Sequence, residues 1–206
     1  LFVQDDIADK VMTMLAGAMK ELKVGDPGLL STDVGPVIDA DALKILQDHA
    51  ERMDREARLI AAAELSAEAA HGTFFAPRAY ELKNLGQLQK EIFGPVLHVI
   101  RWKGEQLDAV IEQINATGYG LTLGVHSRID ETVDRITNGI QVGNVYVNRN
   151  QIGAVVGVQP FGGQGLSGTG PKAGGPHYLL RFATEKTVTV NTTAAGGNAS
   201  LLTLGD

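Results

Sequence analysis

Apolar residues recur at helical spacing in the first two segments of the chain. From Asp6 to Leu22 they fall at every third or fourth position, and Asp5 or Asp6 can cap the start of a helix there. A second run with this period begins at Asp39, and its opposite face is rich in Asp, Glu and Arg. The pattern therefore predicts two amphipathic helices that each turn one face to a core.

Strand-like and helix-like segments alternate through the middle of the chain. The β-branched run from Val96 to Trp102 predicts a strand. We expect it to be followed by a helix over 105–116, a strand over 121–126, a helix over 130–138 capped by Asp130, and a strand over 142–147. Before them, 57–63 is ambiguous between strand and loop, and 73–82 is extended, with Pro77 indicating an edge or a break. This alternation predicts an α/β fold with a parallel sheet and flanking helices.

Glycine dominates the segment from Gly153 to Gly175. Nine of its residues are glycine, so we expect a long loop, which in a compact domain is usually functional or mobile. A short helix is predicted over 176–182. The run Thr187–Val190 is a strand too apolar for a free edge, so it is expected to pair with something else. The remaining tail is expected to be flexible or to dock through Leu201 and Leu202.

Composition excludes several classes of function. The 206 residues carry a net charge of −6 without a basic cluster, so no nucleic-acid contact is expected. No apolar stretch approaches the roughly 20 residues that cross a bilayer, and no signal peptide is recognisable. The five histidines show no metal-ligand spacing, so no metal site is predicted. The chain has no cysteine and therefore no thiol chemistry of its own.

Two motifs could carry ligand chemistry. Glu91-Ile92-Phe93-Gly94-Pro95 places a carboxylate, which can accept two hydrogen bonds from a ribose diol, beside an aromatic ring that can cover a flat ring. The alternative is a surface Glu with a core Phe. The glycines of 160–170 could turn their amides towards an anion, or form an ordinary loop.

Four motifs in a fixed order resemble the C-terminal half of the aldehyde dehydrogenase superfamily. They are Glu-x-Phe-Gly-Pro at 91–95, Asn-x-Thr-x-Tyr-Gly-Leu at 115–121, Gly-Asn-Val-Tyr-Val-Asn at 143–148, and Pro-Phe-Gly-Gly with Ser-Gly-x-Gly over 160–170. The stretch 163–182 is similar to the aldehyde-anchor loop of pyrroline-5-carboxylate dehydrogenases, and 187–198 resembles the proline utilization A family. The resemblance implies NAD-dependent oxidation of L-glutamate γ-semialdehyde to L-glutamate in proline catabolism.

The resemblance also implies roles for particular residues. Glu91 would bind the nicotinamide ribose, and Phe93 would pack near the nicotinamide. Amides of Gly174 and Gly175 would hold the α-carboxylate of the substrate, and Phe182 would pack on its carbon chain. Charge-assisted bonds from closely approaching glycine amides fit that role.

Catalysis in the resembling family needs groups that this chain lacks. A cysteine thiol attacks the aldehyde, hydride passes to NAD, and water hydrolyses the thioester. In that family the cysteine lies a few residues before the strand that begins here at Leu1, so the resemblance implies that it lies just upstream of this chain. Leu1-Phe2-Val3 itself reads as the end of a buried strand, which suggests a fragment of a longer protein. The isolated chain is therefore expected to be inactive.

The resemblance also sets expectations for the rest of the protein. Residues 1–185 would be part of the catalytic domain, and residues 186–206 an oligomerisation strand and tail. A Rossmann domain and an FAD-dependent proline dehydrogenase domain would lie upstream in a homo-oligomeric, cytoplasmic protein, with peripheral contact to the inner membrane through the latter domain.

Two alternatives remain from the sequence. One is a noncatalytic aldehyde-dehydrogenase-like domain that serves in assembly or as a lid, although the motif at 91–95 and the intact anchor loop favour the catalytic version. The other is an unrelated phosphate-binding protein that uses the glycine loop.

Overall fold

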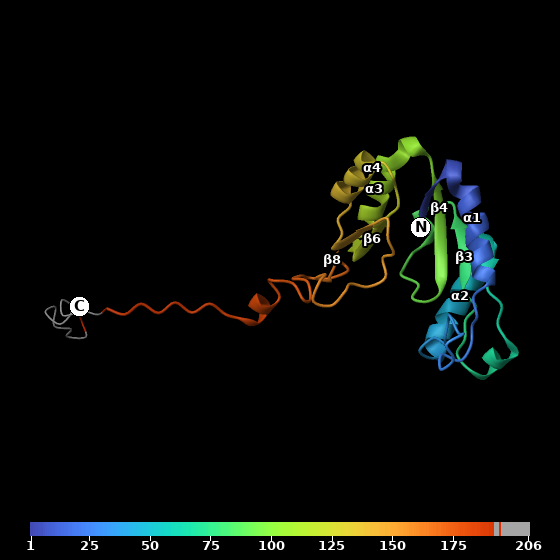
Figure 1. Cartoon of the computed structure of the whole chain (residues 1–206), viewed down its shortest axis with the longest axis horizontal. Coiled ribbons are helices and arrows are strands. Elements are labelled where there is room, and N and C mark those ends of the chain that lie inside the picture. Colours follow the sequence, from blue (N-terminus) through green and yellow to red (C-terminus); the bar gives the residue numbers. More distant parts are fainter. Residues whose placement is uncertain (192–193, 195–206) are drawn as a thin grey trace. The chain divides into compact units, whose positions relative to one another are not determined.

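The computed structural model of the chain describes residues 1–191 and 194, apart from the side chain of Glu68. The chain divides into two compact units, unit 1 (Leu1–Thr117) and unit 2 (Gly118–Asp206), and Figure 1 colours them in chain order. This boundary was not foreseen. The division into 1–185 and 186–206 rested on the family resemblance and stays a prediction, and Leu201 and Leu202 lie outside the described residues.

Unit 1 is built on a four-stranded sheet in the order β1-β4-β3-β2. Its strands are β1 (Phe2–Gln4), β2 (Arg58–Ala62), β3 (Arg78–Leu82) and β4 (Val96–Trp102). β4 pairs in parallel with both β1 and β3, whereas β2 joins the edge of β3 antiparallel. The predicted parallel sheet is therefore confirmed, with one antiparallel edge strand, and the ambiguous segment 57–63 supplies that strand.

The two predicted amphipathic helices are α1 (Asp5–Lys20) and α2 (Ala40–Glu56). Asp39 caps α2 as expected, since its Oδ1 accepts from the Ala42 amide at 2.7 Å. The cap expected for α1 was wrong: Gln4 holds that position without a side-chain bond. Asp5 and Asp6 instead fall in the first turn, where their charge favours the helix dipole.

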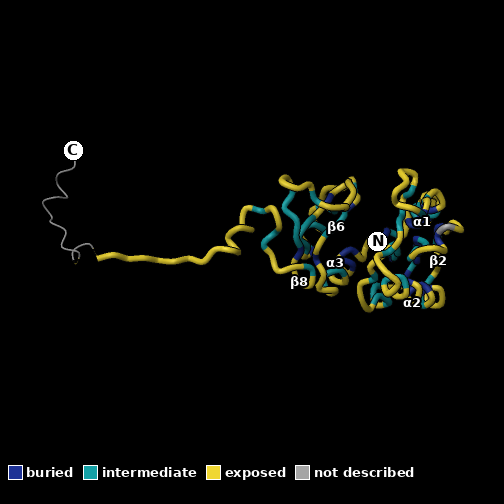
Figure 2. The backbone as a smooth tube through the Cα atoms, turned by 90° about the horizontal axis from the view of Figure 1, so that it is seen from below, coloured by how far each residue is buried: buried dark blue, intermediate teal, exposed yellow. Residues whose placement is uncertain are grey.

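Two consecutive residues of β4 place these helices on opposite faces of the sheet. Val99 packs in a buried cluster with Ala8 and Met12 of α1. Its neighbour Ile100 packs in another, with Met53 of α2 and the fully buried Tyr80 of β3. Because successive side chains of a strand point to opposite faces, α1 covers one face and α2 the other. Figure 2 shows the dark, buried segments along these elements.

The last helix of unit 1 is α3 (Leu107–Ala116), which follows a short 3-10 turn, η3 (Gly104–Gln106). The sequence predicted one helix over 105–116, so only its first turn differs. Two further 3-10 turns are η1 (Ala67–His71) and η2 (Leu85–Gln87). The second of these begins the segment that carries Glu91.

Unit 2 contains a parallel pair of strands joined by a helix. β6 (Thr122–Val125) pairs with β7 (Asn144–Val147), and α4 (Asp130–Gly139) connects them. β5 (Tyr119–Gly120) pairs antiparallel with β8 (Gln164–Gly165) from the glycine-rich loop. The predicted βαβ step from 121 to 147 is thus present. The predicted step from 96 to 126 is not, because β4 pairs with β1 and β3 and not with β6. Ile129 rather than Asp130 is the N-cap of α4.

The end of the described chain lacks the predicted strand. The short helix expected over 176–182 is the 3-10 turn η4 (Leu179–Phe182). Residues 183–191 are exposed throughout and carry neither helix nor strand, as the yellow tube in Figure 2 shows. Val188 and Val190 are each 69% exposed, which is unusual for β-branched apolar residues. Pairing of this run with another chain stays a prediction.

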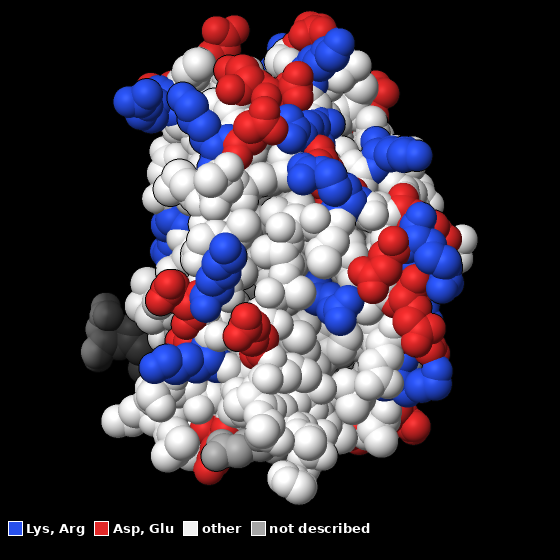
Figure 3. All heavy atoms as spheres, turned by 90° about the vertical axis from the view of Figure 1, so that its right-hand side faces the viewer, with Lys and Arg blue, Asp and Glu red and all other residues white. Residues whose placement is uncertain are grey.

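Charges of both signs are interspersed on the face of the molecule in Figure 3, without segregation into a single-sign patch. Among the described residues, no helix has the length and apolar character needed to cross a membrane. Nor does the described part bring together three His, Asp or Glu side chains that could hold a metal ion.

Two histidines from different elements of unit 1 form a pair that the sequence did not predict. Nε2 of His49 on α2 lies 2.9 Å from Nε2 of His98 on β4, and the rings meet edge to face at 83°. One nitrogen must donate and the other accept, so at least one ring is neutral. Burial lowers the pKa of His49, and burial together with the neighbouring His49 lowers the pKa of His98 to about 4.

This pair predicts that unit 1 loses stability as pH falls. Both folded pKa values lie below the unfolded value near 6.5. Below about pH 6.5 the unfolded chain therefore binds protons that the folded chain resists, and stability declines until about pH 4. Urea unfolding at pH 7 and pH 5 measures the difference. The single tryptophan, Trp102 at the end of β4, reports this unit by fluorescence.

The variant His98→Gln should reduce the difference in unfolding free energy between the two pH values. His126→Gln is the matched control, because His126 is an exposed histidine outside unit 1. An equal pH dependence in the wild type and in His98→Gln would contradict the assignment.

Candidate functional site

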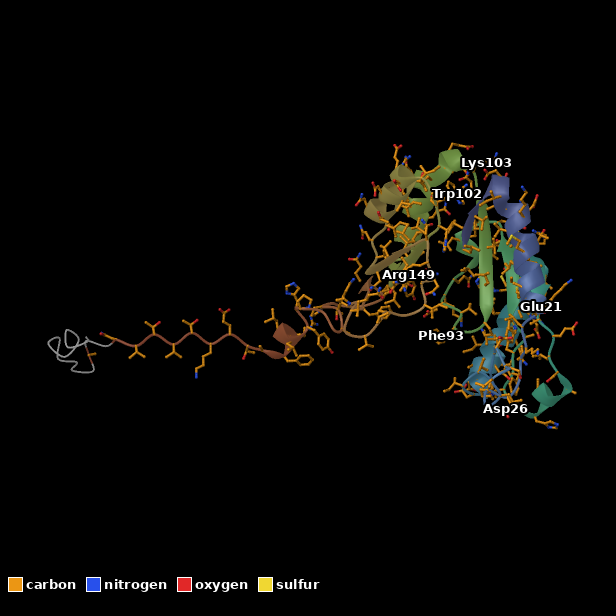
Figure 4. The ribbon with its side chains drawn as sticks, in the orientation of Figure 1. Glu21, Asp26, Phe93, Trp102, Lys103 and Arg149 are labelled. Carbon is orange, nitrogen blue, oxygen red and sulfur yellow. The ribbon has the colours of Figure 1, made fainter. Side chains whose placement is uncertain are left out.

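The segment 91–95 presents two side chains outward and one inward. Ile92 packs against the buried cluster of Leu46, Ala50 and Phe75, whereas Glu91 and Phe93 on either side of it are exposed. Phe93 is 86% exposed, and Figure 4 shows it at the loop that leads into β4. This overturns the alternative of a core Phe, because Ile92 and not Phe93 is the residue of this segment that packs on the core.

Glu91 and Phe93 suit the ligand that the sequence suggested. Within the described residues the Glu91 carboxylate makes no hydrogen bond or ion pair, and the Phe93 ring has almost no protein cover. A free carboxylate two residues from a bare aromatic ring can bind a diol and cover a flat ring together. The residues present therefore fit the ribose and nicotinamide of a dinucleotide.

The backbone of unit 2 holds the glycine-rich loop at several points. Phe161 and Ala173 exchange two backbone hydrogen bonds of 3.0 and 2.9 Å. The Asn144 side chain donates to the Pro160 carbonyl and accepts from the Gly162 amide. These bonds close residues 161–173 into a defined loop anchored on β7.

Glycines inside this loop and next to it allow close contact between backbone segments. A Cβ on Gly143 would lie 1.8 Å from the Gly162 carbonyl oxygen, and a Cβ on Gly165 would lie 2.4 Å from the Gly118 carbonyl oxygen. The amides of Gly162, Leu166, Ser167 and Gly168 all donate within unit 2. The idea of an anion nest over 160–170 therefore fails for these four amides.

The predicted carboxylate anchor lies at the end of the loop. Gly174 adopts a φ of +70°, which favours glycine, and its amide donates to no described residue. The Gly175 amide instead donates to the Lys172 carbonyl at 3.1 Å. Gly174 thus offers a free donor, and Gly175 one that is shared with a turn.

Phe182, the third predicted substrate residue, lies on η4 and is 74% exposed. Its ring meets Tyr178 edge to face, with centroids 5.5 Å apart. The apolar surface that the sequence assigned to the substrate chain is therefore accessible. No described contact joins it to Gly174 or Gly175.

An open pocket of about 670 Å³ in unit 2 includes Gly175. Arg149, Lys172 and His177 also line it, and the Arg149 guanidinium lies over the Tyr146 ring at 5.1 Å. Sequence reasoning did not single out Arg149. The signal was its place just beyond the carboxyl end of β7, after Asn148, since ligands in α/β proteins bind at the carboxyl ends of parallel strands.

The predicted residues thus belong to different units. Glu91 and Phe93 lie in unit 1, whereas Gly174, Gly175 and Phe182 lie in unit 2. Their local geometry is defined within each unit.

The chain is similar in sequence to proteins of known function. The bifunctional protein PutA of Klebsiella aerogenes is 54% identical over 191 residues, which are 90% of this chain and 15% of that protein. The 1-pyrroline-5-carboxylate dehydrogenase of Geobacillus sp. is 40% identical over 188 residues, 90% of this chain and 36% of that enzyme. The chain therefore spans a small part of the relatives that it matches.

Solved structures agree with the sequence relatives. A crystal structure of a proline utilization A mutant from Bradyrhizobium japonicum has a TM-score of 0.89 and 61% identity, covering 95% of this chain and 20% of that one. A 1-pyrroline-5-carboxylate dehydrogenase from Thermus with bound NAD has a TM-score of 0.79 and 37% identity, covering 88% and 35%. The model of the aldehyde dehydrogenase family matches residues 1–188, and the chain belongs to that family.

Proposed function

We propose that the chain is the C-terminal part of an NAD-dependent dehydrogenase module that oxidises L-glutamate γ-semialdehyde to L-glutamate in proline catabolism. The observation that carries this proposal is the outward presentation of Glu91 and Phe93 in a chain 54% identical to a bifunctional PutA. A noncatalytic assembly domain would have no physical need to leave this pair uncovered.

The cofactor end of the site is supplied by unit 1. The aldehyde dehydrogenase family implies a nicotinamide dinucleotide, which accepts a hydride when bound. In this chain Glu91 would accept hydrogen bonds from the ribose hydroxyls, and Phe93 would pack near the nicotinamide. The relative from Thermus that was solved with bound NAD supports NAD as the dinucleotide.

The substrate end is supplied by unit 2. The free Gly174 amide and the shared Gly175 amide would hold the α-carboxylate, and Phe182 would pack on the carbon chain. The cationic side chains of Arg149 and Lys172 in the adjoining pocket favour an anionic substrate. The 1-pyrroline-5-carboxylate dehydrogenases among the relatives support the identity of that substrate.

The remaining parts of the reaction would come from elsewhere in a longer polypeptide. These parts are the nucleophilic cysteine, a Rossmann domain and an FAD-dependent proline dehydrogenase domain. The bifunctional relatives, of which this chain covers only a small part, support the presence of further domains. A cytoplasmic homo-oligomer, peripheral to the inner membrane through the proline dehydrogenase domain, fits the same proposal. The exposed run Thr187–Val190 would pair with a second copy.

The isolated chain should not reduce NAD in the presence of glutamate semialdehyde, because it contains no thiol to attack the aldehyde. The full-length protein should reduce it. Absorbance of NADH at saturating substrate measures both. Turnover by the purified chain alone, or an inactive full-length protein, would contradict the proposal.

Replacing Glu91 by Ala in the full-length protein should weaken NAD binding more than aldehyde binding. The lost charge-assisted hydrogen bonds are worth about 1.5–3 kcal/mol, or roughly a 10- to 150-fold rise in the Kd of NADH. Fluorescence titration with NADH provides the measurement. Glu105→Ala, another exposed glutamate in unit 1, is the control, and equal titration curves for both variants would refute the assignment.

Side chains added at the anchor should discriminate between substrates. A Cβ on Gly175 would lie 3.0 Å from the Lys172 carbonyl oxygen, and Gly174 has a φ that L residues rarely adopt. Gly174→Ala and Gly175→Ala should therefore lower kcat/KM for glutamate semialdehyde by about tenfold, as for a lost charged hydrogen bond. Aliphatic aldehydes should be affected less, and Gly17→Ala is a control with open space around it. Equal losses for both substrate classes would exclude the anchor.

A further inference from the structure

Helix α2 contacts the segment that carries Glu91 at two places, one before Glu91 and one after it. Near the C-terminus of the helix, Arg52 donates to the Gln87 carbonyl at 3.1 Å, and the Gln87 side chain donates to the Glu56 carbonyl at 3.1 Å. Earlier in the helix, Leu46 and Ala50 belong to the buried cluster on which Ile92 packs. The segment between these contacts is therefore held on α2 before and after Glu91.

The contact at Leu46 leaves no room for a side chain at position 94. A Cβ built on Gly94 would lie 2.6 Å from both Cδ1 and Cδ2 of Leu46 and 3.1 Å from its Cγ. The three nearest heavy atoms all belong to this one leucine. Leu46 is fully buried, so its methyl groups cannot turn away into solvent.

The backbone after Gly94 is fixed as well. The Val96 amide donates to the Gly94 carbonyl at 2.8 Å, and the Arg78 amide donates to the Pro95 carbonyl at 3.0 Å. These bonds tie the turn to the first pair of the β3–β4 ladder, Arg78 with Val96. The turn therefore cannot lift away from Leu46 without breaking sheet hydrogen bonds.

We infer that Leu46 is a positioning residue for the dinucleotide. Its side-chain methyl groups lie against Gly94 and fix the position of the turn at 94–95, and thereby the positions of Glu91 and Phe93. This inference rests on the proposed function, because it assigns a consequence for cofactor binding to a contact within the core. Ile92 adds a second link between this cluster and the site, since it lies between Glu91 and Phe93 and packs on the cluster that contains Leu46. Figure 4 places Phe93 at this end of β4.

A double-mutant cycle in the full-length protein tests the inference, with the Kd of NADH and the KM of the aldehyde as readouts. Gly94→Ala should raise the Kd of NADH on the order of tenfold, the loss expected when a displaced Glu91 weakens one charge-assisted hydrogen bond. Leu46→Ala removes Cγ, Cδ1 and Cδ2, so the double variant should bind NADH more tightly than Gly94→Ala alone. The part of the loss that remains is the backbone strain of a side chain at the φ of +158°. The aldehyde KM should stay within about twofold throughout, because the proposed aldehyde groups share no described contact with Leu46 or Gly94 and such sites couple weakly.

Leu43→Ala is the matched control. Leu43 lies on the same helix and packs on the same cluster, but it is not among the atoms nearest to Gly94. This variant should lower stability and leave the Kd of NADH unchanged. A Kd raised as much as in Leu46→Ala would show that general loosening of the core is the cause, and would overturn the inference.

The outcomes separate this inference from the proposed function. The role of Leu46 is overturned if Gly94→Ala leaves the Kd of NADH unchanged, or if the double variant binds NADH no more tightly than Gly94→Ala. Neither result affects the proposed function, which the wild-type activity tests. Absence of NADH binding by the wild type removes the proposed function and the inference together. Should Gly94→Ala fail to fold, Leu46→Ala alone decides: a raised Kd of NADH with an unchanged aldehyde KM supports positioning, and equal changes in both overturn it.

Discussion

Burial of β4 between two helices is the constraint on which unit 1 depends. Val99 and Ile100 are consecutive and point to opposite faces, so one strand needs α1 on one side and α2 on the other. Apolar surface removed from water on both faces drives this arrangement. Once α2 is packed against the sheet, its remaining side chains can contact the segment that leads into β4.

The turn at Gly94-Pro95 enters that strand, and its position follows from the same packing. Leu46 faces Gly94, and Gln87 bonds to the end of α2, so the intervening carboxylate and ring are presented by elements that cannot move independently. Sites built on packed helices and strands hold their side chains more precisely than free loops do. Glu91 and Phe93 are therefore exposed residues on a segment that packed elements hold in place.

Unit 2 reaches a defined loop by a different route. Its glycines permit backbone to approach backbone at Gly143 with Gly162 and at Gly165 with Gly118, and this leaves few amides free. The Gly174 amide is one that no described residue uses. A long loop is thereby fixed by hydrogen bonds, and the free amide at its end belongs to a residue whose φ favours glycine.

The sequence by itself determined the amphipathic helices, the strand at 96–102, the βαβ order and the family, because periodicity and motifs are local properties of the chain. It also named Glu91 and Phe93, yet their exposure depended on Ile92 between them packing on the cluster of Leu46, Ala50 and Phe75. Only the tertiary structure decided the antiparallel edge strand, the His49–His98 pair, the place of Arg149 beside Gly175 and the seat of Gly94 on Leu46. Each of these joins residues far apart in the chain, and such pairings follow from packing that no local pattern encodes.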